Sequence, residues 1–347
     1  MFENHRGEGA TTVQTRWWLI FSSRPGRLAA AVLAEGRGAE RSGRQQVGTG
    51  FRAVPRSPER RSVGWSKMHA MQLPERIALC ERKWDLNAVE RLDGGHHCDV
   101  FGGITGEGDD VVLKLTPTVQ ECAMEADALA VWAGTDAAIA LLAADLEAAA
   151  LLLQRLQPGT HLPPGDDSTA IVTAAALLAR LHSAGTTSGF PSLLEAYEDY
   201  ERRVRAAAEW EQRQLAKPQP IGLSRLPIAR AAAQRLCATT PKAVLLHGDF
   251  IDKNLLWDGS RYVAIDPTPR VGDPCSDIGF FAAYHPPGTG IIDRASAVAD
   301  RMGQNPDRAV RWAAVWAVGE ACETWRYDSD DLQTVVSSDE FGGLLQT

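Results

Sequence analysis

The segment that most constrains the fold is residues 244–266, which interrupts an otherwise helical second half of the chain. Two short apolar runs, V-L-L and Y-V-A-I, flank a polar loop that reads H-G-D-F-I-D-K-N, and the second run ends in D-P. Short apolar runs bounded by polar turns are typical of strands. The pattern therefore places Asp249 and Asn254 on a loop between two strands, and Asp266 at the end of the second strand.

These three residue types at this spacing fit phosphoryl transfer, which asks little covalent chemistry of the protein. Asp249 could orient and deprotonate an attacking hydroxyl, while Asn254 and Asp266 could hold Mg²⁺ on the phosphates of ATP. The competing interpretation is that all three are turn and cap residues, where Asp and Asn are common.

The full order of motifs favours the first interpretation. After I-D-P at 265–267 comes G-D-P-C-S-D at 272–277. Protein kinases carry H-R-D-x-x-x-x-N and D-F-G at the corresponding places. The stretch resembles the catalytic loop and metal-binding Asp of the aminoglycoside phosphotransferases. More narrowly, roughly residues 80–330 resemble the aminoglycoside/hydroxyurea antibiotic resistance kinases, which include streptomycin 6-phosphotransferases, although Thr268 stands where that group commonly has Lys.

The resemblance implies an α+β, protein-kinase-like two-lobed fold, with a small antiparallel β N-lobe and a larger helical C-lobe. It implies ATP and Mg²⁺ as cofactors, Asp249 as the catalytic base, and Asn254 and Asp266 as metal ligands. Asp277 would support the catalytic loop by accepting backbone hydrogen bonds. No A-P-E motif follows Asp266, which argues against a protein kinase.

An upstream lysine fits the same interpretation. Lys114 is the one charged residue in the apolar run V-V-L-K-L. A lysine inside such a strand is unfavourable unless it is paired, and otherwise would lie at a solvated edge. The resemblance implies that Lys114 reaches the ATP phosphates, with Glu125 on the following helix as its partner and Glu121 as the alternative.

Two further segments would contact the nucleotide. The loop D-G-G-H-H-C-D has no G-x-G-x-x-G pattern, but backbone amides near Gly95 could cap the phosphates. The run L-Q-R-L resembles the hinge that binds adenine through backbone groups, which assigns Gln154 and Leu156 to cofactor binding.

The rest of the chain follows a strand-rich and then a helix-rich order. A loop with Q-P-G and P-P-G marks the boundary between an N-lobe at 68–156 and a C-lobe at 157–347. Apolar periodicity and turn residues predict the following elements. The expected strands are 86–92, 98–105, 111–115, 139–143, 148–153, 243–246 and 262–265, and the expected helices are 119–133, 169–183, 192–215, 224–238, 273–284, 291–303 and 307–326.

Charge divides the chain differently. Residues 1–67 carry 11 Arg and one Lys against five Glu, whereas the remainder carries 24 basic and 39 acidic residues. The first 67 residues are expected to be a disordered basic extension, a targeting segment, or the result of a mis-assigned start before Met68 or Met71. The acidic body favours a cationic small-molecule partner over nucleic acid. The apolar runs are too short to span a membrane. Six scattered cysteines suit reduced thiols in a cytoplasmic protein. The protein is expected to be a monomer or dimer.

The acceptor is less constrained by the sequence. Streptomycin carries two guanidinium groups, so its site would present carboxylates, and Trp316 and Trp325 could form walls or belong to the core. Another small acceptor (a different antibiotic, hydroxyurea, a sugar or an amino alcohol) and a catalytically weak nucleotide-binding regulatory protein stay open. The candidate carboxylates are Asp252, Asp273, Glu320 and Glu323, with Asp328, Asp330 and Asp331 close by.

Overall fold

The structure is a computed structural model, in which the chain divides into the compact units Met1–Glu75 and Arg76–Thr347. The expected extension at 1–67 lies outside the described residues, and everything below concerns the second unit except the first three residues of helix α1. The structure describes residues 71–92, 97–163, 167–185, 188–215, 221–284, 290–324 and 330–346.

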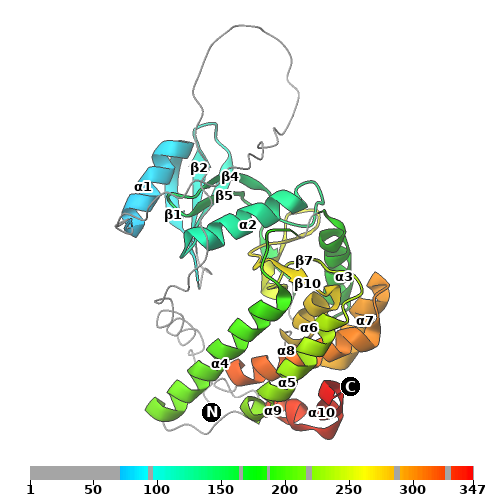
Figure 1. The fold of residues 1–347 in the computed structure, drawn as a ribbon. Coiled ribbons are helices and arrows are strands. Elements are labelled where there is room, and N and C mark those ends of the chain that lie inside the picture. Colours follow the sequence, from blue (N-terminus) through cyan, green and yellow to red (C-terminus); the bar gives the residue numbers. More distant parts are fainter. Residues whose placement is uncertain are drawn as a thin grey trace, which may run out of the picture. The chain divides into compact units, whose positions relative to one another are not determined.

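The first part of this unit is built on a five-stranded antiparallel sheet with strand order β1-β2-β3-β5-β4 (Figure 1). Helix α1 precedes it, and the Arg76 guanidinium of α1 donates to the carbonyls of Thr116, Ala148 and Ala149. The elements are α1 (Leu73–Trp84), β1 (Leu86–Arg91), β2 (Asp99–Thr105), β3 (Asp110–Leu115), α2 (Val119–Trp132), β4 (Leu141–Asp145) and β5 (Ala150–Gln154).

Strand register decides which side chains share a face of this sheet. Val100 pairs with Lys114, and Gly102 pairs with Val112. Directly opposed residues point to the same side, and side chains alternate along a strand. One face therefore carries Val100, Gly102, Val112 and Lys114, and the opposite face carries the buried residues Phe101, Val111, Leu113 and Leu115.

Helix α2 lies on the Lys114 side. Thr118 caps its first turn in a reciprocal capping box with Glu121, which satisfies backbone N–H groups that a helix start leaves unpaired. Its Leu129 and Trp132 belong to the same core cluster as Leu151 and Leu153 of β5. This packing fixes the helix, and with it the side chain of Glu125, beside the strand that carries Lys114.

The second part is mainly helical. Small sheets interrupt it: β7 pairs with β10, and β8 lies between β6 and β9. The helices are α3 (Asp167–Ser183), α4 (Leu193–Leu215), α5 (Ile221–Ala238), α6 (Pro274–Tyr284), α7 (Ile291–Met302), α8 (Pro306–Thr324), α9 (Asp330–Ser337) and α10 (Asp339–Gln346). The short elements are β6 (Thr160–His161), β7 (Val244–Leu246), the 3₁₀ turn η3 (Asp252–Asn254), β8 (Leu255–Trp257), β9 (Tyr262–Ala264) and β10 (Arg270–Gly272).

Helices α6 and α8 form the centre of this helical part. The residues of α6 from Pro274 to Ala283 are all buried, including the polar Ser276 and Asp277. A Cβ on Gly279 would lie 2.5 Å from the backbone nitrogen of Ala313, so this glycine allows the two helices to approach closely. The start of α6, which follows the G-D-P motif, is therefore held rigidly.

The predicted α+β class with an antiparallel sheet followed by a helical part is confirmed. The predicted strands 139–143 and 148–153 occur about two residues later, as β4 and β5. Helices α1, α9 and α10 and strands β6, β8 and β10 were not predicted. Five of the twelve residues of α1 are charged, which obscures its apolar spacing, and β10 gains strand geometry only by pairing with β7.

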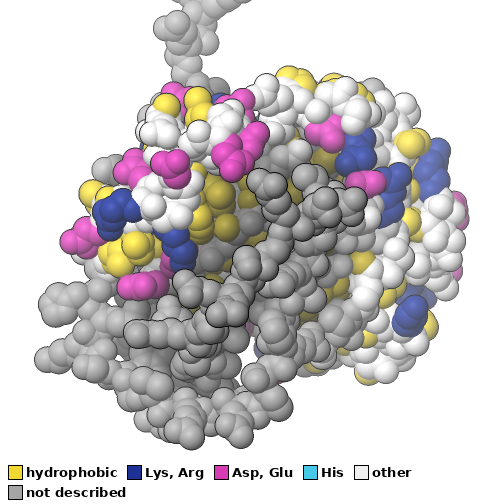
Figure 2. Space-filling model, turned by 90° about the horizontal axis from the view of Figure 1, so that it is seen from above, with side chains coloured by type: hydrophobic (Ala, Val, Ile, Leu, Met, Phe, Trp, Pro, Cys, Tyr) yellow, Lys and Arg dark blue, Asp and Glu magenta, His cyan; other side chains and the backbone are white. Residues whose placement is uncertain are grey.

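No helix in the described parts of the chain is long and apolar enough to cross a membrane. On the molecular face in Figure 2, acidic, basic and apolar side chains are interspersed.

Candidate active site

The loop after β7 owes its shape to Gly248. This residue has a φ of +75°, and a Cβ there would lie 2.0 Å from the carbonyl oxygen of Thr268. The backbone N–H of Thr268 in turn donates to the His247 carbonyl at 2.9 Å. Only glycine fits such a close approach. The segment after Asp266 is thus laid directly against the loop that carries Asp249.

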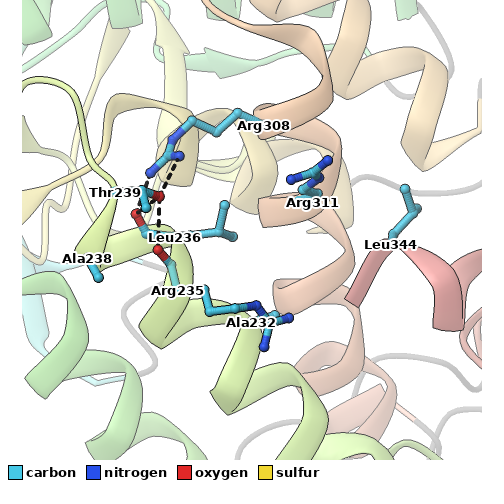
Figure 3. Close-up of a pocket in the computed structure, with 8 residues that line it drawn as sticks. All are labelled: Ala232, Arg235, Leu236, Ala238, Thr239, Arg308, Arg311 and Leu344. Carbon is cyan, nitrogen blue, oxygen red and sulfur yellow. Dashed lines mark hydrogen bonds between the residues drawn. The ribbon is translucent and has the colours of Figure 1, made fainter. Parts of the chain in front are cut away.

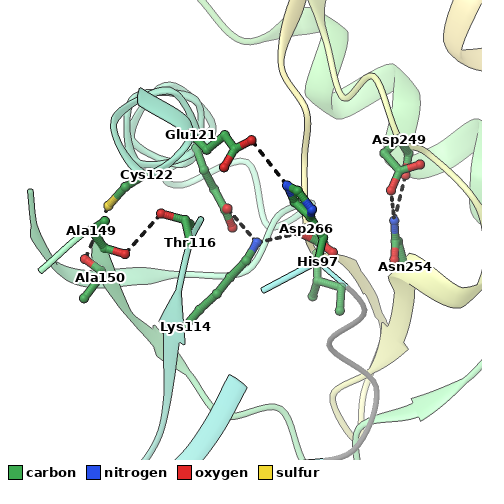
Figure 4. Close-up of polar contacts among 12 residues, drawn as sticks. His97, Lys114, Thr116, Glu121, Cys122, Ala149, Ala150, Asp249, Asn254 and Asp266 are labelled. Carbon is green, nitrogen blue, oxygen red and sulfur yellow. Dashed lines mark hydrogen bonds and ion pairs between the residues drawn. The ribbon is translucent and has the colours of Figure 1, made fainter. Parts of the chain in front are cut away.

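Asp249 and Asn254 face each other across this loop (Figure 4). The Asn254 amide nitrogen donates to the Asp249 carboxylate at 2.8 Å and to the Asp249 carbonyl at 2.9 Å. Burial, and then the negative charge of Asp266, raise the pKa of Asp249 to about 6. A carboxylate held in place by a neutral amide, with a pKa near neutrality, suits a general base.

Lys114 joins the two parts of the unit. Its ammonium lies 2.5 Å from Glu125 Oε2 and 2.5 Å from Asp266 Oδ1 (Figure 4). Burial alone would lower the pKa of Lys114, but the two carboxylates outweigh it and raise the pKa above its usual value. Glu121, the alternative partner, instead contacts His97 and caps α2.

Asp266 lies where β9 ends, in a left-handed conformation with a φ of +59°. Its side chain is 52% exposed, in contrast to the buried side chains of Lys114 and Glu125. Loss of hydration tends to raise the pKa of Asp266, but the Lys114 ammonium outweighs it, so the pKa falls below its usual value. Asp266 therefore presents an ionised carboxylate to solvent.

Asp277 holds the start of the loop that carries Asp249 through backbone hydrogen bonds. Its carboxylate accepts hydrogen bonds from the backbone N–H groups of His247 at 2.8 Å and Gly248 at 3.0 Å, and it contacts His182 Nε2 at 2.9 Å. Although burial raises the pKa of Asp277, the hydrogen bond with His182 helps hold it below its usual range. Burial lowers the pKa of His247 to about 4, so its ring is neutral.

The oxygen atoms of Asn254 and Asp266 fit Mg²⁺, a hard cation that prefers oxygen ligands. Asn254 uses its amide nitrogen on Asp249, which leaves its amide oxygen as the ligand atom. Within the described residues, no group of three or more His, Cys, Asp or Glu side chains could hold a metal ion. Two protein ligands suit Mg²⁺, since it commonly takes the remainder from phosphates and water.

Arg270 is a neighbour of Asp249 that was not among the predicted site residues. Strand β10 places it opposite Leu246, and its Nε would lie 3.3 Å from a Cβ on Gly248. Burial, and then the nearby charge of Arg203, lower its pKa to about 10. The only sequence signal was its place between the I-D-P and G-D-P motifs.

The predicted acceptor carboxylates Asp252, Asp273 and Glu320 come from different parts of the fold. Asp252 lies in η3 between Asp249 and Asn254, and its Oδ1 accepts from the backbone N–H of Lys253. Glu320 is buried on α8, and the side chain of Glu323 lies outside the described part of the structure. Trp325 and Asp328 lie outside the described residues, and the side chains of Asp330 and Asp331 are not described either.

Asp273 and Trp316 have structural partners. Asp273 is fully buried, and Arg308 Nε and Trp312 Nε1 donate to its Oδ2 at 2.5 and 2.6 Å. Arg308 also donates to Thr239, at the edge of a cavity of about 350 Å³ between α5, α8 and α10 (Figure 3). Trp316 is buried among aromatic rings and donates to Ser276 Oγ at 3.1 Å. The structure thus places both in the core.

The expected nucleotide contacts are partly described. Gln154 ends β5, pairs with Val111 and has an exposed side chain, while Leu156 is buried. Gly95 lies outside the described residues.

The aminoglycoside/hydroxyurea antibiotic resistance kinase family matches residues 83–327. This chain belongs to that family. A streptomycin 6-kinase of Streptomyces griseus is 31% identical over 208 residues, which is 59% of this chain and 65% of that protein. The match thus spans slightly less than two thirds of that relative's length.

The fold of this resistance-kinase family member is similar to two solved structures. A choline/ethanolamine kinase family protein from Mesorhizobium loti has a TM-score of 0.55 at 18% identity, covering 78% of this chain and 98% of that one. A streptomycin–ATP–APH(2")-IIa ternary complex has a TM-score of 0.51 at 16% identity, covering 80% and 97%. The predicted protein-kinase-like fold is confirmed.

Proposed function

We propose that this chain is a phosphotransferase that moves the γ-phosphoryl group of ATP to a hydroxyl of an aminoglycoside of the streptomycin type. The observation that carries the proposal is the joining of Lys114, Glu125 and Asp266 beside the Asp249–Asn254 pair. Family membership and the 31% identity to a streptomycin 6-kinase support the acceptor class.

Lys114 is the residue that would bind the ATP phosphates. Its ammonium stays charged between two carboxylates, and Glu125 holds it on the face of the sheet that α2 leaves partly open. Asn254 and Asp266 would hold Mg²⁺, which when bound supplies positive charge to the phosphate oxygens. The ATP-containing neighbour in the same fold supports the choice of nucleotide.

Asp249 would accept the proton of the acceptor hydroxyl as that oxygen attacks phosphorus. With a pKa of about 6 it is mainly ionised at neutral pH, and Asn254 fixes the orientation of its carboxylate. Positioning and electrostatic stabilisation, rather than a covalent enzyme intermediate, are the usual sources of catalysis in this reaction. Phosphorylation of the acceptor would block its antibiotic action, which gives resistance.

The assignment of residues 68–156 to nucleotide binding and 157–347 to catalysis and acceptor binding is part of the proposal. So are backbone contacts of Gly95, Gln154 and Leu156 with the nucleotide. Asp252 is the acceptor carboxylate that best fits, because η3 places it between the proposed base and a proposed metal ligand.

The test is ADP release from ATP and Mg²⁺ by the full chain, with streptomycin, other aminoglycosides, hydroxyurea, sugars and amino alcohols as acceptors. Streptomycin-dependent ADP release, with a phosphate ester detected on the product by ³¹P NMR, is the expected result. An Asp249→Ala variant should release acceptor-dependent ADP about 10³-fold more slowly. ATP binding without turnover on any acceptor would favour a regulatory nucleotide-binding protein and overturn the proposal.

A further inference from the structure

Arg155 follows β5 directly, where the chain leaves the sheet and enters the predicted hinge. Its guanidinium turns back onto strand β2. The position that a Cβ would take on Gly102 lies 2.8 Å from Arg155 Nη1 and 3.3 Å from Cζ. Gly102 is buried even though it has no side chain, and the guanidinium fills the space that a side chain would take.

That space lies on the Lys114 face of the sheet. Gly102 pairs with Val112, and Val112 is two residues from Lys114 on the same strand, so all three point to one side. Leu92 is on this side too, because its Cδ2 lies 3.3 Å from the same Cβ position on Gly102. The Arg155 guanidinium therefore shares a face with the lysine that the proposed function assigns to the phosphates.

The surroundings of Arg155 on this face are apolar and only half covered. Leu92, Val100 and Val112 are all partly exposed, whereas Leu151 and Leu153, further along the sheet, are buried in the core cluster with α2. A half-covered apolar surface next to a phosphate-binding lysine has the character of a surface for a flat ring. The order along the face is thus lysine, apolar surface, guanidinium.

The guanidinium itself has unused binding capacity. Among the described residues, it makes no hydrogen bond or ion pair. A guanidinium is planar, weakly hydrated and stacks readily on aromatic rings, and a cation over such a ring gains about 0.5–2 kcal/mol. The flat partner that fits this place is the base of the nucleotide.

We propose that Arg155 is a nucleotide-binding residue whose guanidinium packs against the purine ring, in addition to the backbone contacts expected of the hinge. The inference rests on the proposed function, because it takes the Lys114 face as the nucleotide site. It assigns base recognition to a side chain for which only backbone contacts were expected.

The test compares binding of ATP and of inorganic tripolyphosphate, which has the phosphates but no base, by calorimetry without any acceptor. Arg155→Met keeps the length and apolar character of the side chain and removes the cation. We expect this variant to bind ATP about tenfold more weakly and tripolyphosphate unchanged. Equal weakening of both ligands would mean that Arg155 contacts phosphates, and no weakening of ATP would mean that it contacts nothing; either result overturns the inference.

A second variant tests the geometry. Gly102→Ala would push away the flexible end of Arg155, and we expect ATP binding to weaken in the wild-type background but not further in the Arg155→Met background. Additive losses would contradict the contact. Because these measurements need no acceptor, absence of streptomycin turnover would refute only the proposed acceptor, whereas failure of the wild-type chain to bind ATP would overturn both proposals.

Discussion

Asp266 and Asp249 belong to the same site, but their surroundings shift their carboxylate pKa values in opposite directions. Asp266 is paired with the Lys114 ammonium, and its pKa is lowered. Asp249 has the neutral Asn254 amide as its hydrogen-bond partner, and its pKa is raised to about 6. The difference fits the proposed roles, in which one carboxylate stays charged and the other exchanges a proton, although both belong to one short stretch of chain.

The largest effect on activity is expected from removal of the Asp249 carboxylate, the proposed proton acceptor. We expect Asp249→Ala to lower kcat with streptomycin by about 10³-fold, since a positioned base contributes about 10²–10⁴-fold. ATP affinity should stay within about threefold of wild type, because Lys114 still binds the phosphates. Steady-state kinetics and calorimetry check this, and a variant with wild-type kcat would remove Asp249 from the reaction.

Removal of the Lys114 ammonium would take away the cation that keeps Asp266 charged and neutralises Glu125. We expect Lys114→Met to lose about 3 kcal/mol of folding free energy, because Glu125 is left buried without its cation. kcat/KM should fall by about 10²-fold as phosphate binding is lost. Lys242→Met, at an exposed lysine, is the matched control for thermal unfolding, and equal melting temperatures of the two variants would contradict the buried pair.

The support beneath both carboxylates can be weakened separately. Asp277→Asn keeps the shape of the side chain but replaces one acceptor oxygen with a donor, which would face a backbone N–H of His247 or Gly248. We expect a loss of about 2 kcal/mol in unfolding free energy and a lower kcat at nearly unchanged KM. Chemical denaturation and kinetics measure both. Full stability with full activity would mean that the loop does not depend on Asp277.

The smallest expected effect is a shift in the pH dependence of kcat/KM, which reports the pKa of Asp249. Because Asp249 must be ionised to accept a proton, kcat/KM should rise with pH and level off above about pH 6. Lys253, an exposed lysine, lowers the pKa of Asp249 through its charge. Lys253→Gln should therefore move the acidic limb upward by a few tenths of a pH unit. A limb that moves downward would show that another group titrates.

The loop that carries Asp249 and Asn254 was predictable because its residues are close in sequence. Asp249 and Asn254 are five positions apart, so a single loop conformation brings them together. The Lys114–Glu125 pair was also predicted, since a lysine in an apolar strand needs a partner, and the structure contains this ion pair.

Side-chain direction set by distant packing was not predictable. Asp273 was predicted as an acceptor carboxylate, and its burial by α8 against Arg308 and Trp312 could not be read from the sequence. The turn of Arg155 onto Gly102 depends on a strand more than fifty residues earlier in the chain, and neither residue stands out in a motif.

The contact between Gly248 and Thr268 restricts which amino acid can stand at position 248 but leaves the side chain at position 268 free to vary. The loop is held by the main-chain atoms of residue 268, whose carbonyl approaches Gly248 and whose N–H donates to His247. Every amino acid except proline supplies both of these atoms. The side chain at 268 can therefore change without disturbing the loop, whereas position 248 must stay glycine.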